Sequence, residues 1–180
     1  TFAGATKTPG FSSSHTLSFD TRGQVPVGGK VVAVLPAASD FASASGFVLV
    51  TAASVSFTPS GPTGSVALSG STLTVTVTGS NVIAQAASTA IAVTNVRTPS
   101  SVVSAKSSGT LTTQDSSSKT IDEASGLATD QIVAGTLGGA KTFAGATKTP
   151  GFSSSHTLSF DTRGQVPVGG KVVAVLPAAS

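Results

Sequence analysis

Hydrophobic and polar residues alternate with a period of two along much of the chain. The clearest run is Thr72–Thr78, where three apolar residues alternate with four threonines. Such alternation, rich in β-branched residues, is typical of a strand with one buried face. A second apolar run at residues 65–68 precedes it across Ser-Gly-Ser, a short glycine-containing loop that suits a hairpin. These two runs therefore predict paired strands.

The same pattern predicts several further strands, at residues 16–19, 30–35, 47–51, 54–57, 89–94 and 109–114. Helical periodicity is nearly absent, and only residues 124–133 are expected to hold a short helical turn. Clusters of Pro, Gly, Asn, Asp and Ser mark the turns between the strands. Eight or nine short strands predict an all-β fold, an antiparallel β-sandwich of the Ig-like or jelly-roll kind. Its expected aromatic core is Phe19, Phe41, Phe47 and Phe57.

An identical stretch of 39 residues stands at both ends of the chain. Residues 1–39 recur without one change as residues 142–180, at an offset of 141. Two explanations stay open: an engineered duplication, or a protein with a 141-residue period. Because 141 residues is the size of a domain, and solenoid repeats run about 20–50, we expect globular units in series. Residues 1–141 are thus one full repeat with a linker at about 134–153, and residues 142–180 begin the next.

The second copy is expected to complete a neighbouring sheet. Edge strands leave backbone groups unpaired, and a strand from one unit can pair with them. A fully extended stretch of this length reaches up to roughly 130 Å, enough to cross to a neighbour. The candidate inter-repeat strands are Thr157, Leu158, Ser159 and Phe160, and Lys171, Val172, Val173, Ala174, Val175 and Leu176.

Three turn-and-strand stretches carry a family resemblance. Residues 25–36 hold a Pro-Val-Gly-Gly turn before a buried strand that ends at Pro, residues 92–100 hold an Asn-to-Pro-Ser turn, and residues 108–115 are rich in Ser and Thr. Together they resemble tandem β-sandwich modules of giant surface and extracellular-filament proteins of eukaryotic microbes. The resemblance implies a structural role and an extracellular or cell-surface location.

Composition narrows the classes of protein further. The chain has no Cys, Met, Trp or Tyr, and Ser and Thr make up 55 of 180 residues. Without Cys there is no disulfide, thiol nucleophile or Cys-ligated metal. The longest apolar run, residues 31–35, is far shorter than the about 20 residues that cross a bilayer. The chain starts at Thr with no basic-then-apolar leader, so we expect an internal or processed piece of a longer protein.

The net charge of +3 does not indicate a nucleic-acid partner. Residues 1–141 carry seven basic and six acidic side chains, and the basic ones are scattered singly. Binding to phosphates needs several positive charges close together, because affinity grows with the number of phosphates neutralised. We therefore expect neither nucleic-acid binding nor a membrane span.

No catalytic arrangement is visible in the sequence. Serine hydrolases need a Ser on a strained G-x-S-x-G turn beside a His and an acid, and no such motif occurs. The glycines before Lys30 have one residue too many for a phosphate-binding loop and lead into a strand. His15 is the only histidine of each repeat and is expected to face solvent or to cap a turn. The chain is therefore not expected to be an enzyme or to hold a cofactor.

Two weaker possibilities involve acidic and amide side chains. A calcium site needs several oxygen ligands, but the carboxylates lack the usual loop spacing, so a solvated surface is preferred. A Lys–Asn isopeptide crosslink would need a buried Lys and an acid, and the sequence offers only suitable residue types. The residues concerned are Asp115, Asp122, Glu123 and Asp130 for calcium, and Asn81 and Asn95 for the crosslink.

Sugars are a further candidate modification. Both Asn residues fail the N-x-S/T rule for N-linked glycans. Ser, Thr and Pro clusters resemble those that accept O-linked sugars, although ordinary turn chemistry explains them equally well. The candidate acceptors are Thr8, Thr58, Ser60, Thr63, Thr98 and Ser100.

These observations lead to two expectations of function. The first is a structural repeat of an extracellular filament, joined to copies of itself end to end by strand exchange between successive repeats. The alternative is an adhesin or carbohydrate-binding module on a repetitive surface stalk. The absence of Trp and Tyr removes the usual sugar-stacking platform and favours the first.

Overall fold

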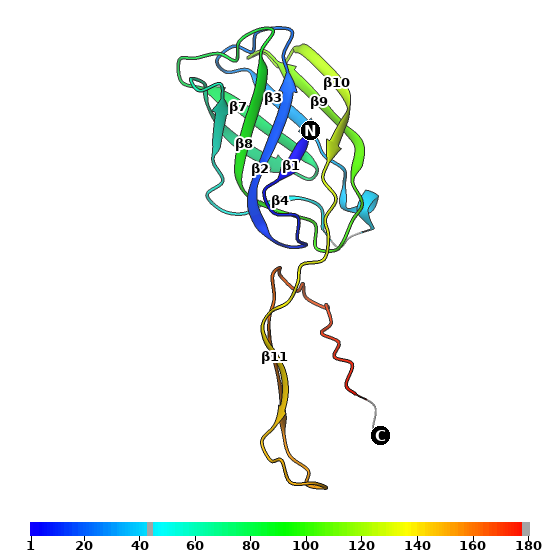
Figure 1. Cartoon of the computed structure of the whole chain (residues 1–180). Helices are drawn as coiled ribbons and strands as arrows, with labels where there is room; N and C mark the ends of the chain where they lie inside the picture. Colours follow the sequence, from blue (N-terminus) through cyan, green and yellow to red (C-terminus); the bar gives the residue numbers. More distant parts are fainter. Residues whose placement is uncertain (43–44, 178–180) are drawn as a thin grey trace.

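Twelve strands and one short 3-10 helix make up the described structure. Figure 1 shows the computed structural model, which describes residues 1–42 and 45–177. The strands are β1 (Phe2–Gly4), β2 (Ser12–Asp20), β3 (Lys30–Val34), β4 (Val48–Leu49), β5 (Val55–Thr58), β6 (Thr63–Ser69), β7 (Thr72–Thr78), β8 (Ser88–Arg97), β9 (Lys106–Gln114), β10 (Thr120–Thr129), β11 (Gly138–Gly145) and β12 (His156–Asp161), and the 3-10 helix η1 is Ala38–Phe41.

Strands β1 to β10 form one large mixed sheet that is nearly barrel-shaped. The order is β4-β8-β2-β1-β10-β9-β3-β7-β6, and β5 also pairs with β8. The chain is all-β, as predicted, but the expectation of an entirely antiparallel sheet is wrong. Phe2 of β1 pairs in parallel with Thr129 of β10. β1 lies between β2 and β10 and forms an antiparallel hairpin with β2. This hairpin fixes the direction of β1, and in that direction β1 is parallel to β10.

Most predicted strands occur where the alternation placed them. β7 covers the whole run Thr72–Thr78, whereas the prediction at 47–51 shrinks to Val48–Leu49. The helical turn expected within 124–133 is wrong, because β10 continues to Thr129. Gly126 has φ +77°, and the pairing of β10 with β9 shifts register there. These irregularities break the alternation that would have identified a strand.

The core lies inside the curled sheet and is built from alternate residues of its strands. The inward residues of β7 are buried while its threonines are partly exposed. Of the four phenylalanines expected in the core, Phe41, Phe47 and Phe57 are buried, and Phe19 is partly buried against them. Phe2, which the sequence did not single out, is buried as well.

Strands β11 and β12 form a separate two-stranded sheet. Their hairpin extends away from the large sheet, and the residues that follow β12 turn near the sheet and then run away from it again (Figure 1). The stretch 134–153, expected as a linker, contains β11 and the loop toward β12. The duplicated sequence thus appears once inside the large sheet and once outside it.

Candidate functional site

The two copies of the duplicated segment form the same hairpin in the same register. In the first copy Phe2 lies opposite Leu17 across β1 and β2. In the second copy Phe143 lies opposite Leu158 across β11 and β12, which is the equivalent pair at an offset of 141. The hairpin therefore forms whether or not the rest of a domain surrounds it.

Local hydrogen bonds at the loop end of the hairpin also recur. The Ala5 amide donates to the Ser14 carbonyl at 2.8 Å, and the Ala146 amide donates to the Ser155 carbonyl at 2.9 Å. Because these bonds join residues within one hairpin, they depend on local sequence alone. The hairpin of the second copy consequently has the same shape as the hairpin of the first.

The surroundings of the two copies differ completely. Leu17 is 0% exposed and Leu158 is 38% exposed, although their local sequences are identical. Phe2 is 1% exposed and Phe143 is 49% exposed. The second hairpin therefore presents to solvent the apolar face that the first one buries.

Three positions in the large sheet hold the first copy. β2 pairs along β8, from Ser12 opposite Arg97 to Asp20 opposite Ser88. β3 lies between β7 and β9 and is paired with both. β1 adds its single parallel pair with β10. We call the strands and loops of residues 40–133 that receive the first copy the acceptor.

The predicted inter-repeat strands correspond to β2 and β3 of the first copy. Thr157, Leu158, Ser159 and Phe160 lie in β12, which pairs with β11 and with no strand of the large sheet among residues 1–42 and 45–177. The second group forms no strand in the described structure, and its members are Lys171, Val172, Val173, Ala174, Val175 and Leu176. Val175 is 93% exposed, and several of its neighbours are also exposed. A strand that is flanked on both sides in the first copy thus has no partner strand in the second.

The second copy approaches the large sheet where Gly164 and Gln165 lie beside Pro9 and Gly10, and a side-chain hydrogen bond joins the two parts there. Arg97 Nη1 donates to Gln165 Oε1 at 3.1 Å, at the exposed end of β8. Such an exposed polar contact contributes little to stability. It leaves the hairpin of β11 and β12 outside the core.

His15 is buried, which corrects the expectation that it faces solvent or caps a turn. It alternates with Leu17 on the inner face of β2, so the pleat directs both side chains inward. Its ring stacks on Phe2 with centroids 5.1 Å apart and meets Phe47 edge-on. Burial lowers the pKa of His15 below its usual value, and the Ser13 backbone and the Asp130 charge oppose that shift in part.

Asp130 links the end of β10 to the first copy. Its Oδ2 accepts the Gly4 amide at 3.0 Å, and its Oδ1 lies 3.1 Å from Lys7 Nζ. The Val133 amide then donates to the Lys7 carbonyl at 2.8 Å. The chain is therefore attached to the first copy as far as Val133.

Three of the carboxylates weighed for calcium, Asp115, Asp122 and Asp130, accept backbone amides. Asp122 accepts the Gly23 amide, and Asp115 Oδ1 accepts the amides of Ser117 and Lys119 in the turn before β10. No group of three metal-ligating side chains occurs within the described ranges. The arrangement of these acids is that of turn caps.

Asn81 and Asn95 do not have the environment that an isopeptide crosslink needs. Both are exposed, and their side-chain amides donate to backbone carbonyls of Gly61 and of Thr51 and Ala52. A buried Lys beside an acid is the setting the crosslink requires. These asparagines therefore stabilise turns and loops through hydrogen bonds to the backbone.

The candidate sugar acceptors fall into two groups. Thr58, Ser60 and Thr63 are exposed around the turn between β5 and β6, while Thr8 and Ser100 are partly buried. Thr98 is 0% exposed; its hydroxyl donates to the Thr8 carbonyl at 2.6 Å and accepts the Phe11 amide. A transferase cannot reach this hydroxyl in the folded chain, so Thr98 is withdrawn as a candidate.

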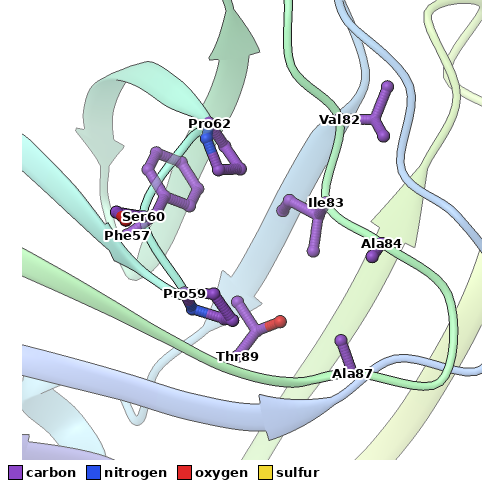
Figure 2. A pocket seen from close by; sticks show the side chains of 9 residues that line it. All are labelled: Phe57, Pro59, Ser60, Pro62, Val82, Ile83, Ala84, Ala87 and Thr89. Carbon is purple, nitrogen blue, oxygen red and sulfur yellow. The ribbon is translucent and has the colours of Figure 1, made fainter.

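A small apolar pocket opens beside the loop that follows β5. Its volume is about 130 Å³, and its lining includes Phe57, Pro59, Pro62 and Ile83 (Figure 2). Thr89 reaches into it from β8, and its hydroxyl is buried with no hydrogen-bond partner in the described structure. Sequence reasoning missed this pocket, because its walls come from two separate segments, residues 57–62 and 82–89, with no shared motif.

Comparisons with known proteins add no family to this description. No helix within residues 1–42 and 45–177 is long and apolar enough to cross a membrane. No protein-family model matches the chain, and neither a curated protein nor a solved structure matches it.

Proposed function

We propose that the chain is a structural repeat of an extracellular filament, a sandwich-like β module that joins copies of itself end to end by strand exchange. The observation that carries the proposal is the contrast between Leu17 and Leu158. The same segment is buried in its first copy and exposed in its second copy. Uncovered apolar surface on a preformed hairpin favours association with a partner of matching shape.

Surface chemistry supports a structural role outside the cell. The outward face of β7 is a row of threonines, and only 9% of all residues are charged. Hydroxyl-rich faces of low charge density suit close packing of many copies, because little like-charge repulsion opposes it. The exposed Thr and Ser around the turn between β5 and β6 add sites where sugars could be attached.

Electron microscopy of the full chain across a concentration series tests the proposal. We expect filaments with one regular axial spacing as the concentration rises. A matched chain with Leu158→Asp keeps the first copy intact and removes the apolar contact of the second, so it is expected to remain as single particles. Single particles of the unsubstituted chain at every concentration would refute the filament.

The pocket beside β5 favours a second candidate, a ligand-binding module on a surface stalk. Its volume is similar to that of cavities that hold a benzene-sized molecule. An apolar group of that size would pack against Phe57, Pro59 and Ile83. Thermal unfolding with phenyl and methyl glycosides tests it: a higher midpoint with phenyl glycosides alone supports binding here, and no change with either rejects it.

A further inference from the structure

We propose that residues 142–180 of one chain replace residues 1–39 in the acceptor of a second chain. The inference rests on the proposed function, because it names the partner surface of that assembly. It differs from simple edge addition: the incoming hairpin takes the place of β1 and β2, and the incoming Lys171, Val172 and Val173 take places in β3. The partner is therefore a second copy of this chain.

Complementarity between the segment and the acceptor is already present in the structure. Each contact that Phe2, His15 and Leu17 make with residues 40–133 is available to Phe143, His156 and Leu158, because the residue types are the same. The backbone register is available too, since β11 and β12 repeat the pairing of β1 and β2. A preformed hairpin has less conformational entropy to lose on docking.

The length of the connection favours a second chain over the same chain. The hydrogen bond of Val133 to Lys7 leaves only residues 134–141 free before the second copy begins at residue 142. To fill its own acceptor, the second copy would have to enter beside β10 in the parallel direction of β1. A parallel crossover needs about a dozen residues or more, and residues 134–141 are fewer than that. Short connections of this kind favour swapping between chains.

Exchange conserves the contacts of the acceptor. One copy of the segment leaves and an identical copy enters, so each contact of the first copy with residues 40–133 is re-formed, and only the exposed bond of Arg97 to Gln165 is lost. Association costs translational and rotational freedom and uncovers residues 1–39, so exchange is favoured only as the protein concentration rises and where the short connection promotes it. Head-to-tail exchange of this kind either closes into rings or continues as an open filament.

Cysteine trapping in the full chain tests the replacement directly. Ser18 lies opposite Ala90 across β2 and β8, and Ser159 is the equivalent of Ser18 in the second copy. Opposite residues in an antiparallel pair have Cα atoms about 4.5–5.5 Å apart, within the range of a disulfide. The chain contains no Cys, so a mixture of a Ser159→Cys chain with an Ala90→Cys chain can form only the crosslinks introduced.

Under mild oxidation we expect a disulfide between the two different chains of this mixture. The matched control replaces Ala90→Cys by Ser125→Cys, an exposed position on β10 that faces β9. Mass spectrometry of the crosslinked peptides identifies the pairs. Preferential linkage of positions 159 and 90 supports replacement, and equal yields in the two mixtures would overturn it.

Rescue of a damaged first copy provides a second test. Leu17→Asp places a charge in the core, but the intact second copy of another chain can fill the acceptor. We expect Leu17→Asp to fold as dimers or larger species whose unfolding midpoint rises with concentration. Leu158→Asp should fold as a monomer, and the double variant should not fold. A Leu17→Asp chain that is as unfolded as the double variant, or that folds as a monomer at all concentrations, contradicts the proposal.

The two proposals fail in different ways. If the unsubstituted chain forms filaments but neither cysteine trapping nor rescue of Leu17→Asp is observed, the structural function is supported and the replacement is refuted. If trapping and rescue are observed but no filaments form, the replacement between chains is supported and the filament function is refuted.

Discussion

Phe143 stacks on His156 with ring centroids 5.0 Å apart and ring planes at 18°. The equivalent rings Phe2 and His15 stack at 5.1 Å and 29°. Phe143 and His156 are exposed on the separate hairpin, whereas Phe2 and His15 are buried in the core beside Phe47. Ring stacking in this segment is therefore a property of the hairpin, and the acceptor supplies only the burial.

Acid should destabilise the domain through His15. Burial lowers the pKa of His15 in the folded chain, so at a pH below about 6.5 the unfolded chain binds a proton that the folded chain does not. Stability is complete above that pH and falls as the pH drops toward the folded pKa, by up to about 1.4 kcal/mol per pH unit. Urea unfolding at a series of pH values measures the slope.

A pair of identical substitutions isolates this effect. His15→Leu should flatten the pH dependence below about pH 6.5. His156→Leu makes the same change at the exposed copy and controls for the substitution itself. An unaltered slope in His15→Leu would mean that other groups carry the acid sensitivity.

Gly4→Ala should destabilise the domain by about 1–3 kcal/mol, through overpacking. A Cβ at Gly4 would lie 2.6 Å from His15 Nε2, and the stacked rings around His15 prevent it from moving away. Gly145→Ala creates a similar approach to His156, but that ring is exposed and can shift. We expect Gly145→Ala to leave the unfolding midpoint nearly unchanged. Equal effects of the two variants would contradict the account.

Thr89→Val should stabilise the chain by about 1 kcal/mol. The buried hydroxyl of Thr89 has no hydrogen-bond partner within the described residues, so folding costs its desolvation without a compensating bond. Valine keeps the shape and removes that cost. Thermal unfolding of both chains decides the sign, and a lower midpoint in Thr89→Val would mean that the hydroxyl is bonded to a molecule in the pocket.

Sugar attachment, where it occurs, should follow exposure. We expect O-linked glycans at Thr58, Ser60 or Thr63 and none at Thr98, whose hydroxyl is buried and bonded. Site-resolved mass spectrometry of the protein isolated from its native source measures the occupancy of each position. Glycan on Thr98 would show that modification precedes folding.

Strand positions were predictable wherever one face of the strand is buried and the other is exposed to solvent. Thr72–Thr78 shows its alternation openly and forms β7 over the same residues. β10 could not be recognised in this way, since Gly126 and the register shifts beside it interrupt the pattern. The burial of His15 could have been inferred from its spacing of two from Leu17, but a polar ring next to three serines suggested a surface.

The pocket and the parallel pair needed the tertiary structure. Phe57, Ile83 and Thr89 are brought together only when β5 and β8 pair, which no local pattern specifies. The direction of β1 beside β10 likewise depends on which gap in the sheet it fills.

Local sequence was sufficient for the hairpin, its register and its ring stack, because these rest on interactions between residues close along the chain. Both copies therefore have them. Burial was decided by the tertiary structure, because it needs the surface of residues 40–133, against which only the hairpin of the first copy packs. Leu17 and Leu158 have the same neighbours in sequence and opposite environments in space. The difference between them is the presence of an acceptor.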